Sequence, residues 1–87
     1  MIAAYERSDI VHIMKMNRFT LSDSDTVHLE FDGQVKGNSY KIKILVFEDL
    51  PRIFIEQNGE VVFNDTVKSI DDLKIFLEER LYKYFEA

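Results

Sequence analysis

The chain has 87 residues, of which 46% are hydrophobic and 31% charged, as is typical of one soluble globular domain spanning residues 1–87. Because cysteine is absent, the sequence excludes disulfides, thiolate zinc sites and cysteine nucleophiles. The net charge of −5 argues against a general binder of nucleic acid or anionic membranes, since either would need a basic surface.

The N-terminal segment carries two competing structural signals. Its first residues contain no apolar stretch of a secretory signal, and no later run reaches the length of a membrane span, so we expect a cytoplasmic protein. Ile10, Ile13 and Met14 lie at helical spacing, whereas the β-branched residues here would also suit a fifth strand. We predict a helix, followed by a loop over residues 17–25, where serine and aspartate cluster.

The middle of the chain has the pattern of an antiparallel meander. Apolar residues alternate with polar ones around Leu29, which predicts a strand with one buried face. Asp32-Gly33 and Gly37-Asn38 indicate a turn, and Pro51 interrupts the next strand. Asn58-Gly59 is typical of a type I′ hairpin turn, which requires positive φ at both central residues. The predicted strands are residues 26–32, 39–47, 52–57 and 60–64.

The Asn58-Gly59 turn also predicts which side chains share a face of the sheet. It places Phe54 opposite Phe63, and Ile55 opposite Val62. One face is then aliphatic, and Lys43 can pair with Glu56 on the other. That second face is expected to carry Leu45, Phe47, Phe54, Val61 and Phe63.

A helix is predicted over residues 70–85, with Ser69 as its N-cap. Its apolar residues fall on one broad arc, so the helix should pack across the aliphatic face of the sheet. Ile75 and Tyr82 lie on its opposite side. The expected fold is therefore α+β, a four-stranded antiparallel meander with a C-terminal helix on one face and an N-terminal helix.

The second, aromatic face raises the question of what covers it. Leaving its large side chains in water would forgo about 1.5 to 3 kcal/mol for each. We expect either the first 16 residues or another chain to cover this face, and we place the first of these slightly ahead.

The sequence contains one group of side chains with metal-ligand character. His28, Glu30 and Asp32 alternate along one predicted strand and would project from one face. The solvated face of a half-buried strand explains the same pattern, so we assign no metal ligand, cofactor or catalytic residue. Lys36, Lys41 and Lys43 would give only a weak, salt-sensitive contact with nucleic acid, and direct binding is not expected.

The leading functional hypothesis is a non-enzymatic protein-interaction module that binds a protein partner or a second copy of itself, forming a homodimer. A more specific alternative is an intracellular inhibitor or immunity-type protein, whose acidic hairpin over residues 48–66 binds a basic surface of a nucleic-acid enzyme or toxin. A further alternative is a small metal-binding protein or enzyme. The expected partner-binding residues are Leu45, Phe47, Phe54, Val61, Phe63, Ile75, Tyr82, Glu48, Asp49, Glu56 and Glu60.

Overall fold

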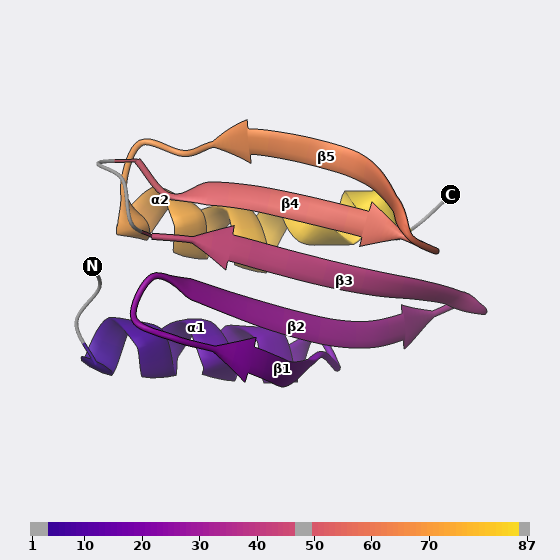
Figure 1. Cartoon of the computed structure of the whole chain (residues 1–87), viewed down its shortest axis with the longest axis horizontal. Coiled ribbons are helices and arrows are strands. Elements are labelled where there is room, and N and C mark those ends of the chain that lie inside the picture. Colours follow the sequence, from indigo (N-terminus) through magenta and orange to yellow (C-terminus); the bar gives the residue numbers. More distant parts are fainter. Residues whose placement is uncertain (1–3, 47–49, 86–87) are drawn as a thin grey trace.

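A computed structural model describes residues 4–46 and 50–85 and shows an α+β fold, as predicted. The elements are α1 (Ala4–Met16), β1 (Thr20–Ser24), β2 (His28–Val35), β3 (Asn38–Leu45), β4 (Arg52–Gln57), β5 (Glu60–Thr66), α2 (Ile70–Ile75), the π-helical turn η1 (Phe76–Arg80) and the 3-10 turn η2 (Leu81–Tyr84). The five strands form one antiparallel sheet in sequence order, with α1 and α2 on the same side (Figure 1). None of the described helices is long and apolar enough to cross a membrane.

The sheet has five strands because part of the predicted loop over residues 17–25 is strand β1. Arg18, with φ of 67°, reverses the chain directly after α1. Its N–H donates to the Lys15 carbonyl and the Phe19 N–H donates to the Met14 carbonyl, each at 2.9 Å, which is a Schellman ending. A left-handed residue at this position is usually glycine, so arginine conceals the turn in the sequence. β1 is exposed throughout and, apart from Leu21, polar, as an edge strand can be.

The N-terminal helix forms as predicted, but it lies on the opposite side of the sheet from the one expected. Ile10, Ile13 and Met14 are buried in the same apolar cluster as the C-terminal helical segment. Lys74 of α2 donates to Asp9 of α1 at 3.1 Å, so the two helices lie next to each other. Five strands make the aliphatic face wide enough for both helices. The expectation that the first 16 residues cover the second face is therefore wrong.

A β-bulge changes the predicted pairing of β4 with β5. Ile55 pairs with Phe63 and Glu56 with Val61, so Val62 is the extra residue. The insertion moves Phe63 to the helix side, where its ring lies 5.2 Å from those of Phe76 and Tyr84. The prediction that Phe63 belongs to the second face, opposite Phe54, is thus wrong.

The C-terminal helical segment follows the predicted limits with one irregularity. The Ser69 hydroxyl accepts from the Asp72 N–H at 3.1 Å, which confirms the N-cap. Beyond Ile75 the α-helix gives way to the η1 and η2 turns, although Leu81 and Phe85 still reach the core.

Gly33 of β2 is required because the buried ring of Phe19 lies directly against its backbone. A Cβ atom at position 33 would stand 2.5 Å from Phe19 Cδ1 and 2.7 Å from Cε1. We expect Gly33→Ala to lower the free energy of unfolding by about 1–3 kcal/mol, because the ring must leave its packed position. Urea unfolding measures this loss. Phe19→Leu should make room for the added methyl, so the double variant should be more stable than the sum of the single effects implies. Strict additivity would contradict this packing.

Candidate functional site

The sheet has one face that no described helix covers, and we call it the open face. Alternation along the strands places six described side chains on it around one hollow of about 520 Å³, together with Val61 at the β4–β5 hairpin. The residues that line the hollow are His28, Glu30, Lys43, Leu45, Phe54, Glu56 and Val61. Four of the expected partner-binding residues, Leu45, Phe54, Glu56 and Val61, are therefore brought together here.

The other expected partner-binding residues do not join this hollow. Phe63 is on the helix side, as described above. Ile75 and Tyr82 are 43% and 49% exposed, but they belong to the helical segment across the sheet from the open face. Glu60 is exposed beside the β4–β5 turn. Residues 47–49, which include the expected Phe47, Glu48 and Asp49, lie outside the described residues.

The charges on the open face pair with one another across three strands. Glu30 Oε1 lies 3.8 Å from Lys41 Nζ and 3.9 Å from Lys43 Nζ. Lys43 Nζ also lies 3.4 Å from Glu56 Oε2, so the predicted ion pair forms. It is diagonal, since Lys43 is directly opposite Phe54. Two of the three lysines considered for nucleic-acid contacts are thus held by carboxylates.

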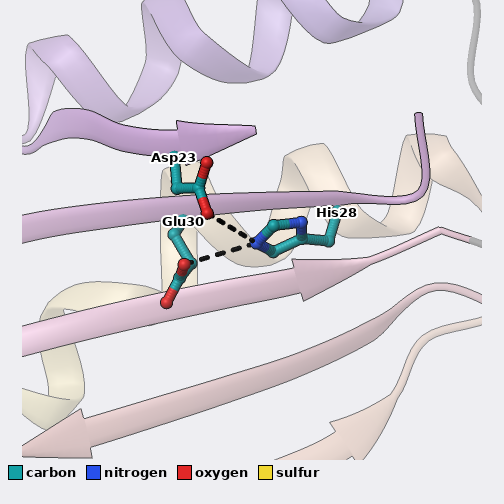
Figure 2. A group of neighbouring side chains, drawn as sticks. All are labelled: Asp23, His28 and Glu30. Atoms are coloured by element: carbon teal, nitrogen blue, oxygen red, sulfur yellow. Dashed lines mark hydrogen bonds and ion pairs between the residues drawn. The ribbon is translucent and has the colours of Figure 1, made fainter. Parts of the chain in front are cut away.

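A histidine and two carboxylates converge at the β1 side of this network. Nε2 of His28 lies 3.3 Å from Glu30 Oε2 and 3.8 Å from Asp23 Oδ2 (Figure 2). The expected third member, Asp32, is exposed further along β2 and is not part of the group. Asp23 takes its place because β1 pairs with β2 so that Asp23 is opposite Glu30.

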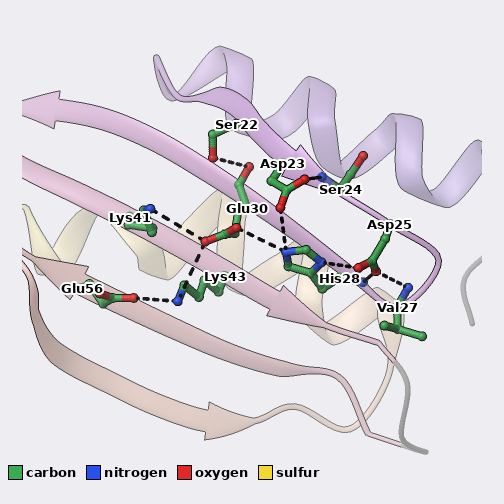
Figure 3. Close-up of polar contacts among 10 residues, drawn as sticks. All are labelled: Ser22, Asp23, Ser24, Asp25, Val27, His28, Glu30, Lys41, Lys43 and Glu56. Atoms are coloured by element: carbon green, nitrogen blue, oxygen red, sulfur yellow. Dashed lines mark hydrogen bonds and ion pairs between the residues drawn. The ribbon is translucent and has the colours of Figure 1, made fainter.

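Asp25 fixes the orientation of the His28 ring from the other side. Its Oδ1 accepts from the backbone N–H groups of Val27 and His28, each at 2.9 Å, in the turn between β1 and β2. Its Oδ2 lies 3.1 Å from His28 Nδ1 (Figure 3). A carboxylate only accepts hydrogen bonds, so Nδ1 donates to Asp25, and Nε2, which faces Asp23 and Glu30, donates to Glu30 when the ring is protonated. The Val27 N–H is the main cause that lowers the pKa of Asp25, with His28 next.

Sequence reasoning found His28 and Glu30 but missed Asp23 and Asp25. Both lie in the Ser22–Asp25 stretch that was expected to be a loop. The Ser22 hydroxyl donates to the Glu30 carbonyl at 3.2 Å, which helps to hold this polar strand in the sheet. The spacing of Asp25 and His28 could have indicated their contact. An aspartate before a tight turn commonly accepts hydrogen bonds from the backbone N–H groups that follow it.

Comparison with known proteins adds no functional information. No protein-family model matches the chain, and neither a curated protein nor a solved structure matches it.

The environment of His28 predicts a pH-dependent contribution to stability. The hydrogen bond with Asp25, followed by that with Glu30, raises the pKa of His28 above its ordinary value of 6.5. The folded chain then holds this proton more tightly than the unfolded chain. The resulting stabilisation is fully present below pH 6.5 and is lost as the pH rises through the folded pKa.

This prediction is checked by an NMR titration of a His12→Gln variant, which retains His28 as its one imidazole. We expect a His28 pKa above 6.5, and a lower value when Asp25→Asn is added. A His28 pKa that does not respond to Asp25→Asn would show that this hydrogen bond does not hold the ring.

Proposed function

We propose that this chain is a non-enzymatic protein-binding module whose open face docks a protein partner with a positively charged surface. The observation that carries the proposal is that both helices pack on one side of the sheet, which leaves the other side open to a partner. An antiparallel sheet can keep one face in water, so an open face needs further features before it suggests a binding surface. Two such features are the net negative charge of residues 20–66 and the apolar side chains on the open face.

The net charge of the chain is concentrated in the sheet segment. Residues 20–66 contain nine acidic and four basic residues, a net charge of −5. The remaining residues contain seven of each and are neutral. A negative central segment between flanking segments that are together neutral supports a basic partner, since complementary charge steers association and excludes wrong partners.

The open face also offers apolar area at its centre. Leu45 and Phe54 are half-buried among the charged side chains, and Val61 is 55% exposed. Burying such a side chain completely contributes about 1.5–3 kcal/mol. An apolar centre within a charged rim is the usual anatomy of a protein interface.

The inhibitor or immunity-type alternative is the specific form of this proposal. A protein surface that holds nucleic acid is basic, so its charge is opposite to the net charge of residues 20–66. Competition between nucleic acid and this chain for the captured partner would distinguish this form from the general one.

A charge-reversal pair tests the proposed surface. Glu60→Lys with Val61→Lys changes the charge by three units at two exposed positions of the β4–β5 hairpin, where Val61 lines the hollow of the open face. Glu78→Lys with Glu79→Gln makes the same change at exposed positions on the helical segment. Affinity capture from the native host should retain a protein on the wild type and on the helical variant. Retention on the open-face variant should fall at least about tenfold, because the added positive charge repels a basic partner. A tenfold fall corresponds to about 1.4 kcal/mol of binding free energy.

Three results would overturn the proposal. Equal capture by both variants would show that the open face is not the binding surface. Capture of nucleic acid instead of protein would identify a different class of ligand. Light scattering that shows a dimer of the wild type, but a monomer of the open-face variant, would make a second copy the occupant.

A further inference from the structure

Asp23, His28 and Glu30 present three potential metal ligands to one point beside the hollow. One ligand atom from each of the three residues lies within 4.8 Å of the other two, and His28 Nε2 contacts Asp23 Oδ2 and Glu30 Oε2. They come from two adjacent strands, with Asp23 opposite Glu30 and His28 two residues before it on the same face (Figure 2). The pairing of β1 with β2 therefore determines this convergence.

The distances suit coordination of one ion. Two ligands of a tetrahedral ion with bonds of about 2.0 Å lie about 3.3 Å apart. The Nε2–Oε2 distance between His28 and Glu30 is 3.3 Å, and the Nε2–Oδ2 distance between His28 and Asp23 is 3.8 Å. The Asp23 side chain is 64% exposed, so it has room to move toward the other two ligands.

Asp25 provides the outer support that metal-bound histidines usually have. It accepts from Nδ1 of His28 and is itself held by two backbone N–H groups (Figure 3). A carboxylate behind a histidine fixes the tautomer and directs the other ring nitrogen at the metal. This contact lies outside the three ligands and orients Nε2 toward them.

Glu30 is oriented in a similar way by two lysines. Lys41 and Lys43 approach Oε1, whereas Oε2 faces His28. The lysines fix the direction of the carboxylate, but their positive charge also opposes a cation. Imidazole nitrogen with two carboxylates favours a first-row transition ion over Mg²⁺ or Ca²⁺, which prefer oxygen ligands.

We propose that the chain binds one divalent transition-metal ion, with Zn²⁺ as the representative, through Asp23 Oδ2, His28 Nε2 and Glu30 Oε2. Because Asp23 is 64% exposed, solvent can supply a further ligand. This site does not depend on the proposed partner-binding function.

Calorimetric titration of the chelator-treated full chain with Zn²⁺ tests the site, in buffer alkaline enough to keep the imidazole neutral. We expect one saturable ion per chain. His28→Gln should abolish binding, and Asp23→Asn or Glu30→Gln should weaken it at least tenfold. Asp25→Asn should weaken binding by about 10–100-fold, because it removes only the orienting contact.

Two matched controls make the result decisive. Asp32→Asn removes one carboxylate charge from β2, the strand that carries His28 and Glu30, and His12→Gln removes the other imidazole. Both variants should leave the affinity for Zn²⁺ within about twofold. Circular dichroism establishes that each variant remains folded. The proposal is overturned if folded wild type takes up no saturable Zn²⁺, if Asp32→Asn weakens binding as much as Asp23→Asn, or if His12→Gln abolishes it.

Discussion

The aliphatic face of the sheet is the surface on which the rest of the structure depends. Its central side chains on β2, β3 and β4 are completely buried, and α1 and the C-terminal helical segment both pack against them. An apolar sheet face must be covered, and here it takes both helices. Because the two helices occupy the same side, the opposite side and both sheet edges are free to carry polar and charged groups.

The open face is less apolar than a regular hairpin would make it. The bulge at Val62 moves Phe63 to the core, and the Lys43–Glu56 pair lies among the remaining apolar side chains. Lysine stems cover apolar surface while their ammonium groups stay in water, which explains why Phe54 is only partly exposed. The internal pairing of these charges also gives the His28 ring a fixed environment, which an isolated surface histidine would lack.

Much of the fold could be predicted from local patterns. Alternation around Leu29, the Asn58-Gly59 turn and the Ser69 cap each depend on a few neighbouring residues, and each has its predicted structure. The errors involve choices that local patterns do not encode. Arg18 adopts a conformation typical of glycine, and nothing in the Val61-Val62-Phe63 run marks the extra residue. In the candidate site, His28 and Glu30 share a strand, whereas Asp23 reaches them only through strand pairing.

The bulge in β5 has a consequence for how copies of this protein meet. β5 is an edge strand with two adjacent exposed valines, and a regular edge of this kind is a template for pairing with a strand of another molecule. An extra residue breaks the even spacing of the unpaired N–H and C=O groups and increases the local twist. The insertion that removes Phe63 from the open face thus also makes this edge a poor starting point for aggregation.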